Sequence, residues 1–313
     1  MSLHGLSSLT FGVPNIPAVA SYYEDFGLDI TRTDADGVTH LATVNGGEQL
    51  HIARADRRRL LAMTVAAEDT DDLDRIASNL ARLGLPVDRR ETSLTTRDPG
   101  TDVAVDVEVL PHIETPPNEP VAYNGPGRPV RLNQRAPGIE RTNRVRPRKL
   151  GHVVLGSIDQ PSSQKFFTEG LGFKISDVVK DEAAFMRCST DHHNVLVQAA
   201  PITLLHHTSW HVDDVDEIGR GAMSMLEEDP DRHVWGLGRH HIGSNFFWYL
   251  KDPAGNFSEY YSDMDCVVDD ELWEPGVWEG VKSLFSWGPT PPDYFFRPED
   301  LAGHMAGAHV GHR

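Results

Sequence analysis

The sequence predicts an α+β protein in which one unit of strands and helices occurs twice in tandem. The first observation is length, because 313 residues exceed an ordinary single domain and favour two or three. The second is an internal repeat, because the pattern of residues 5–30 returns in residues 149–174 at an offset of 144. The third is a tight turn at residues 97–100 that recurs at residues 251–255, each time before a strand that carries a glutamate.

The first copy begins with a strand that ends at Phe11-Gly12, followed by a helix with Tyr22-Tyr23 on one face. Residues 61–76 predict a strand and then an acidic helix start, with the helix cap at Thr70 or Asp71. Apolar residues at helical spacing form one face of this helix: Leu73, Ile76, Leu80 and Leu83. The strand after the tight turn carries Glu108.

The second copy repeats these elements in the same order. Phe166-Phe167 takes the place of Tyr22-Tyr23, and residues 205–218 again predict a strand and an acidic helix start. The last strand carries Glu259, which we align with Glu108 of the first copy.

These boundaries divide the chain into four parts. We expect a first module over residues 1–111, a proline-rich connector over 112–148, a second module over 149–265 and an aromatic-rich tail over 266–313. The tail should pack on the body, because it holds three of the six tryptophans and large apolar rings are costly to leave in water.

Charge and cysteine content bear on the class of protein. With 29 Lys+Arg against 47 Asp+Glu the net charge is −18, which argues against nucleic acid and anionic membrane surfaces as partners. The two cysteines, Cys188 and Cys266, form no Cys-x-x-Cys pattern and are expected to be reduced thiols. The chain start does not resemble a signal peptide, so we expect a cytoplasmic protein.

Histidines distinguish the second copy from the first. At the offset of 144, His152 stands where the first copy has Ser8, and His207 falls opposite Ala62 or Met63. Two imidazoles and one carboxylate on one face form the triad that binds non-haem Fe(II) with open coordination positions. Three histidine doublets complicate the choice of ligands: His192-His193, His206-His207 and His240-His241. Because neighbouring side chains of a strand point to opposite faces, we expect only one member of each doublet to enter a shared cavity.

The segment from Gly238 to Glu259 carries a more specific pattern. A histidine at 240 is followed nine residues later by Tyr249, then by the Asp252-Pro253-Ala254-Gly255 turn, and Glu259 comes ten residues after the tyrosine. Together with Leu205-His206-His207 and His152, this pattern resembles the type I extradiol ring-cleaving dioxygenases of the vicinal oxygen chelate superfamily. These include catechol 2,3-dioxygenase and 2,3-dihydroxybiphenyl 1,2-dioxygenase.

The resemblance implies the fold, the site and the activity. The fold would be two tandem modules, each of paired βαβββ units that curl into an open mixed half-barrel, with the metal in the second module and none in the first. The metal ligands would be His152, His207 and Glu259, holding Fe(II), with Mn(II) as the alternative. His193 would transfer protons, and His240 and Tyr249 would orient the substrate oxygens. The substrates would be a catechol and O2, and the protein a homo-oligomer, a tetramer or larger.

Two alternatives remain open from the sequence. Another metalloenzyme of the same superfamily, such as a glyoxalase or a 4-hydroxyphenylpyruvate dioxygenase, shares the ligand pattern but lacks the spacing of 240, 249 and 259. A metal-free binding protein of the bleomycin-resistance type would need no triad. The sequence also leaves open whether His211, the tail or Arg297 contacts a substrate.

Overall fold

A computed structural model describes residues 3–119, 121–297 and 299–303, so the end of the expected tail lies outside the described residues. The chain folds into two open, mixed β-sheets with helices, one built from each copy of the repeat. This confirms the predicted α+β class with two tandem units. Within the described residues, no helix is long and apolar enough to cross a membrane.

The first module contains two βαβββ units. The first unit is β1 (Leu3–Val13), α1 (Ile16–Asp25), β2 (Asp29–Thr33), β3 (Thr39–Thr43) and β4 (Gly47–Arg54). The second is β5 (Arg59–Ala67), α2 (Thr70–Arg82), β6 (Asp88–Arg89), β7 (Ser93–Arg97) and β8 (Ala104–Val109). The eight strands lie in the order β2-β3-β4-β1-β5-β8-β7-β6, with β1 and β5 antiparallel at the centre. The sheet is mixed, because β4 runs parallel to β1 and β8 parallel to β5.

The second module repeats this plan. Its first unit is β9 (Lys149–Ser157), α4 (Gln160–Lys165), the π-helical turn η1 (Phe166–Leu171), β10 (Lys174–Val179), β11 (Ala183–Arg187) and β12 (Val195–Ala199). Its second unit is β13 (Leu204–His211), α5 (Val215–Glu228), the short turn η2 (Pro230–Arg232), β14 (His233–His240), β15 (Phe246–Lys251) and β16 (Phe257–Ser262). The central strands β9 and β13 are antiparallel, and β16 runs parallel to β13.

The C-terminal tail extends both edges of the second sheet. Strand β17 (Gly276–Trp278) pairs with β10, and β18 (Phe285–Trp287) pairs with β14 at the opposite edge. Between them lies η3 (Gly280–Ser283), and α6 (Asp293–Phe296) follows. Phe295 of α6 is buried among aromatic rings of the second module, so this part of the tail packs on the body.

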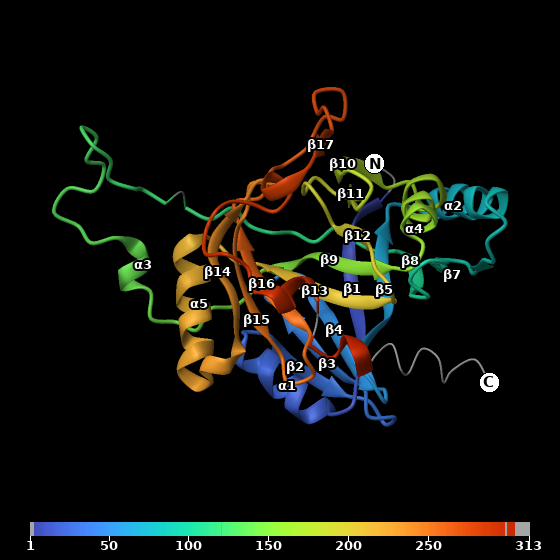
Figure 1. Cartoon of the computed structure of the whole chain (residues 1–313), viewed down its shortest axis with the longest axis horizontal. Coiled ribbons are helices and arrows are strands. Elements are labelled where there is room, and N and C mark those ends of the chain that lie inside the picture. Colours follow the sequence, from blue (N-terminus) through green and yellow to red (C-terminus); the bar gives the residue numbers. More distant parts are fainter. Residues whose placement is uncertain (1–2, 120, 298, 304–313) are drawn as a thin grey trace.

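The connector leaves the body as an extended arm that carries α3 (Pro137–Glu140) and returns to the second module (Figure 1). Arginines of the connector pair with carboxylates of the same chain. Arg148 binds Asp213 at 2.6 and 2.7 Å, and Arg141 binds Asp214 at 2.6 Å near the start of α5. Arg141 and Arg148 therefore connect the arm to the second module.

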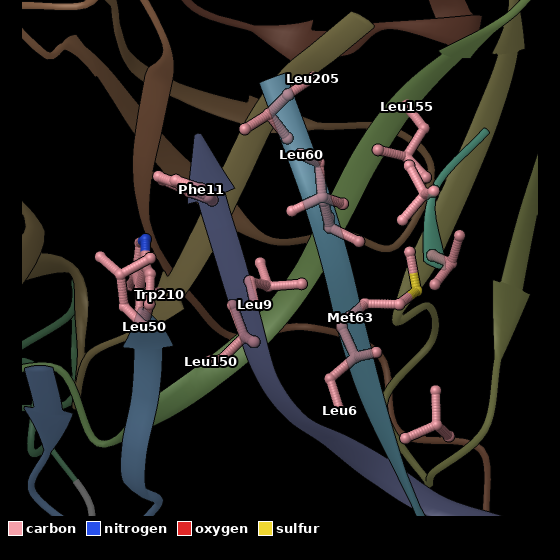
Figure 2. Packing of buried hydrophobic residues seen from close by; sticks show 14 of the residues in the cluster. Leu6, Leu9, Phe11, Leu50, Leu60, Met63, Leu150, Leu155, Leu205 and Trp210 are labelled. Carbon is pink, nitrogen blue, oxygen red and sulfur yellow. The ribbon is translucent and has the colours of Figure 1, made fainter. Parts of the chain in front are cut away.

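The two modules share one hydrophobic core, in which β1 contacts β9 and β5 contacts β13. Figure 2 shows Leu9 and Met63 of the first module in the same cluster as Leu150 and Leu155 of the second. Burial of these side chains contributes roughly 25 cal/mol per Å² of apolar surface removed from water. The modules are therefore fused along their central strands.

Aromatic contacts extend this interface to β16. The rings of Phe26 and Tyr260 stack with centroids 3.8 Å apart and an interplanar angle of 2°. The hydroxyl of Tyr22 lies 2.5 Å from Oγ of Ser258, and both side chains are buried. Tyr22 in α1 and Phe26 just after it thus pack against one face of β16.

Helix α2 begins one residue earlier than the sequence suggested. The cap is Asp69, whose side chain accepts a hydrogen bond from the backbone N–H of Asp72 at 2.9 Å, so the expectation of Thr70 or Asp71 was wrong. Asp69 has extended backbone angles, as a capping residue requires, whereas Thr70 is already helical.

Candidate metal centre

Three adjacent strands of the second sheet bring the expected metal ligands together. Ser209 of β13 is paired with His152 of β9 on one side and with Glu259 of β16 on the other. His207 lies two residues before Ser209 and therefore on the same face of the sheet. Ser209 is small and completely buried, so it leaves the space between the three larger side chains open.

The donor atoms of this triad converge in a buried place. Nε2 of His152 lies 3.1 Å from Oε2 of Glu259, and Nε2 of His207 lies 3.7 Å from the same oxygen. One ligand atom of each of the three residues lies within 4.8 Å of the others. Oε2 is buried and has no hydrogen-bond partner among the described residues. Two imidazole nitrogens and one unpartnered carboxylate oxygen fit a divalent first-row metal ion, so these residues can hold one.

The charges of the site also suit a cation. Burial lowers the pKa of His207 well below its usual value, so that imidazole is neutral and offers a lone pair. Burial alone would raise the pKa of Glu259, but the neighbouring imidazoles of His152 and His240 outweigh it and leave the pKa below its ordinary value. The triad therefore combines the neutral imidazole of His207 with an ionised carboxylate.

A cavity of about 690 Å³ opens over the triad and is lined by the other expected site residues. His193 lies with its ring centroid 4.2 Å from that of His152. Nε2 of His240 lies 2.9 Å from the hydroxyl of Tyr249. Burial lowers the pKa of His193 and raises that of Tyr249, so the first is a neutral imidazole and the second a protonated phenol. Five of the six residues named from the sequence thus line one cavity, and Glu259 is completely buried beside them, next to His152 and His207.

The remaining wall of the cavity is largely apolar. Residues of the second sheet and of the tail form it: Val154, Val179, Ala183, Phe185, Leu196, Ile242, Phe285, Pro291, Phe295 and Phe296. Among the described residues that line the cavity, none is a lysine or arginine, and Arg297 is not one of them. His211 stacks on Tyr261 with centroids 5.0 Å apart and does not line the cavity either. Glu182 and Gln198 also line the cavity, so its described wall combines apolar surface with a few polar groups of which none is a lysine or arginine.

The expectation that only one histidine of each doublet enters the cavity was wrong for His206-His207. Strand β13 has a register shift between Leu205 and His207, so residue 206 is an extra residue in the ladder to β9. Such a bulge interrupts the alternation of side chains, and both His206 and His207 line the cavity. A bulge has no signature in this stretch of sequence, which is why His206 was missed.

The alignment of Glu259 with Glu108 was also wrong. Glu259 pairs with Ser209, whose counterpart in the first module is Thr64, and Thr64 pairs with Asp106. Glu259 lies four residues after Gly255, the last residue of its turn, whereas its counterpart Asp106 lies six residues after Gly100. Glu108 lies two residues beyond that counterpart. The same register makes Ala62, rather than Met63, the counterpart of His207.

The first module therefore has Ser8, Ala62 and Asp106 at the triad positions. Another cluster in this module contains His40, Glu48 and His51. Arg32 already binds this cluster, with a guanidinium nitrogen 3.1 Å from Oε2 of Glu48 and from Nδ1 of His40. A cation would have to displace that guanidinium.

Asn245 is a further residue at the metal centre that the sequence did not reveal. Its side-chain nitrogen donates to Oε1 of Glu259 at 3.1 Å, and it is completely buried. This bond engages one carboxylate oxygen and leaves Oε2 directed at the imidazoles. An asparagine in the short segment between β14 and β15 carries no recognisable pattern.

Comparison with known proteins agrees with this geometry. Residues 149–260 match the Glyoxalase/Bleomycin resistance protein/Dioxygenase superfamily. Metapyrocatechase 2 of Cupriavidus necator is 30% identical over 95% of this chain and 92% of its own. The manganese-dependent 2,3-dihydroxybiphenyl 1,2-dioxygenase of Geobacillus genomosp. 3 is 29% identical over 46% of this chain and 50% of its own.

Solved structures share the fold along almost the whole chain. A halotolerant catechol dioxygenase has a TM-score of 0.75 at 19% identity, covering 97% of this chain and 98% of its own. The Mn(II)-bound glyoxalase of Novosphingobium aromaticivorans has a TM-score of 0.74 at 24% identity, covering 93% of each chain. With a full-length relative at 30% identity, the chain belongs to the extradiol ring-cleaving dioxygenases of the glyoxalase, bleomycin-resistance and dioxygenase superfamily.

Proposed function

We propose that this enzyme opens the ring of a catechol with O2, next to rather than between the hydroxyl-bearing carbons, using Fe(II) held by His152, His207 and Glu259. The observation that carries the proposal is the buried His-His-Glu cluster at the floor of an apolar cavity. Such a triad leaves coordination positions for both substrates. The bound metal would lower the pKa of a coordinated catechol hydroxyl and bring catechol and O2 together. Mn(II) remains the alternative ion.

The surrounding residues have separate roles in this proposal. Nδ1 of His240 lies 2.6 Å from the backbone carbonyl of Leu284 and donates to it, so Nε2 is left to accept a hydrogen bond. The phenol of Tyr249 can donate to Nε2 or to a substrate oxygen. These two side chains orient the substrate oxygens.

Proton transfer falls to His193 in this proposal. A neutral imidazole is a base, so His193 can take the proton of a catechol hydroxyl and return it later in the reaction. Phe295, which is buried, contributes apolar surface to the wall of this cavity.

The substrate class follows from the cavity wall. With no lysine or arginine among the described lining residues, a carboxylate-bearing catechol would lack a counter-ion, whereas an alkyl or aryl substituent would bury apolar surface. We therefore propose an uncharged, apolar-substituted catechol as the substrate.

We also propose a cytoplasmic homo-oligomer, a tetramer or larger, with no nucleic-acid or membrane partner. The connector arm supports the oligomer, because Leu132 and Ile139 on it are 66% and 70% exposed. Apolar side chains on an extended arm are suited to burial against another copy.

The test is anaerobic reconstitution with Fe(II), followed by catechol, 3-methylcatechol or 2,3-dihydroxybiphenyl in air. We expect O2 uptake with formation of a yellow semialdehyde, faster for the apolar-substituted substrates than for 3,4-dihydroxybenzoate. Glu259→Gln should lose both metal and turnover. No O2 uptake with any catechol would refute the proposal. Turnover of a glutathione hemithioacetal without O2 would indicate a glyoxalase instead, and turnover of 4-hydroxyphenylpyruvate a different dioxygenase.

A further inference from the structure

Two buried histidine doublets make the same unusual contact. In the pair His206 and His207, the two Nδ1 atoms lie 2.7 Å apart. In the pair His192 and His193, the two Nδ1 atoms lie 3.1 Å apart. In both pairs the second histidine lines the catalytic cavity. Nε2 of the first histidine lies within hydrogen-bond distance of an oxygen atom.

The partner of His206 determines its tautomer. Nε2 of His206 lies 2.7 Å from the backbone carbonyl oxygen of Phe295, and a carbonyl oxygen can only accept a hydrogen bond. Nε2 of His206 therefore carries the hydrogen. His206 is buried, which favours the neutral imidazole, so its Nδ1 is a lone-pair acceptor.

The tautomer of His206 determines the tautomer of His207, the neighbouring metal ligand. If Nδ1 of His206 accepts, the 2.7 Å contact requires that Nδ1 of His207 carries a hydrogen and donates it. A neutral His207 then has its lone pair on Nε2, the atom that lies 3.7 Å from Oε2 of Glu259. The opposite tautomer would place a hydrogen where the metal is to bind.

We infer that His206 is a positioning residue, which holds His207 in the tautomer and ring orientation that present Nε2 to the metal, with the carbonyl of Phe295 in the C-terminal tail as its anchor. The bulge in β13 serves this arrangement, because it turns residue 206 to the same side as residue 207. A metal-binding histidine usually donates its second ring N–H to a carboxylate, a carbonyl or water. Here an imidazole takes that place, and the inference rests on the proposed metal site.

The His192-His193 pair supports the inference independently. Nε2 of His192 lies 3.0 Å from Oδ2 of Asp177, a carboxylate that likewise accepts. By the same reasoning, Nδ1 of His192 accepts a hydrogen bond from Nδ1 of His193. The lone pair of His193 then lies on Nε2. The third doublet differs, because Nδ1 of His241 lies 3.1 Å from Oγ of Ser286 rather than near His240.

Three substitutions separate the two hydrogen bonds of His206. In His206→Asn the amide oxygen lies near the place of Nδ1 and can still accept from His207. In His206→Gln the amide lies near the place of Nε2 and keeps only the bond to Phe295. His206→Phe keeps the ring volume and loses both bonds. His241→Phe is the matched control, because His241 does not line the cavity and its Nδ1 lies near Ser286 rather than near a metal ligand.

The readout is the affinity of each metal-free protein for Co(II), measured by its visible absorption in competition with a chelator, beside a thermal melt. We expect His206→Asn to remain within about threefold of the wild type, and the Gln and Phe variants to bind about 10- to 100-fold more weakly. His241→Phe should bind as the wild type does. Equal affinity of the Asn and Phe variants, or wild-type affinity of the Phe or Gln variant, would overturn the inference.

A second measurement needs no variant. In ¹⁵N-histidine-labelled wild type without metal, we expect the ring of His207 to carry its hydrogen on Nδ1, and a hydrogen on Nε2 would overturn the inference. Both readouts are independent of ring cleavage. A protein that binds Co(II) as expected but oxidises no catechol would contradict the proposed function and leave the role of His206 intact.

Discussion

Asn245 provides the sharpest test of how the carboxylate of the triad is oriented. Its side-chain nitrogen donates to Oε1 of Glu259 at 3.1 Å, and both residues are completely buried. The substitution Asn245→Leu removes the donor at nearly constant volume, so it opens no large cavity. Glu259 is then free to rotate and direct either oxygen away from the imidazoles.

The magnitude follows from the kind of bond that is lost. A hydrogen bond to a charged group contributes about 1.5–3 kcal/mol, which corresponds to a factor of roughly 10 to 100 in an equilibrium constant. Loss of a residue that orients a metal ligand has a similar effect on metal affinity. We therefore expect Asn245→Leu to weaken Co(II) or Fe(II) binding about 10- to 100-fold.

The assay is an anaerobic metal titration in competition with a chelator, with Asn79→Leu at a partly exposed position of α2 in the first module as the control. Turnover at saturating metal should recover partly, because the ligands themselves remain. If Asn245→Leu bound metal as tightly as the wild type while the control also did so, the hydrogen bond to Oε1 would have no part in placing Glu259. The reasoning from the orientation of the carboxylate would then be refuted.

Three further predictions concern catalysis, pH and stability. Tyr249→Phe should lower kcat about 10- to 100-fold and leave metal affinity within a factor of three, and an unchanged kcat would exclude the phenol from the reaction. Burial raises the pKa of Asp252 to about 6 from 3.8, so the native carboxylate takes up its proton before the unfolded one as the pH falls. The unfolding free energy of the wild type, measured with urea against Asp252→Asn, should therefore rise by about 2 kcal/mol from pH 8 to pH 4. A difference independent of pH would contradict this. Phe26→Ala should destabilise the protein by about 3–5 kcal/mol in urea, because it empties the stack against Tyr260, and a loss under 1 kcal/mol would contradict the shared core.

Much of the fold could be predicted because the repeat is long and its aromatic and turn residues keep their spacing. The pairing of Tyr22-Tyr23 with Phe166-Phe167 located both helical segments, and the second of them includes a π-helical turn that no residue pattern indicates. Strands β17 and β18 were not predicted, because three residues are too short to show alternation. Their pairing depends on the edges of a sheet that forms elsewhere in the chain.

The site could be predicted less completely, for reasons of geometry. His240, Tyr249 and Glu259 lie on three consecutive strands that form two hairpins, so a local sequence pattern contains all three. The choice among histidines of a doublet depends on strand register, and one bulged residue was enough to bring His206 into the cavity. Asn245 acts only through its contact with a strand 14 residues away, so its role becomes visible when the strands are assembled.

Strand β16 connects the metal centre of the second copy to the first copy of the repeat. Glu259 faces the metal centre, while its neighbours Ser258 and Tyr260 face the other way and meet Tyr22 and Phe26 of the first copy. Deletion of the first copy would expose the reverse side of the strand that carries the carboxylate. The copy that lacks the triad therefore supports the carboxylate of the copy that has it, and we expect substitution of Tyr22 or Phe26 to lower metal affinity.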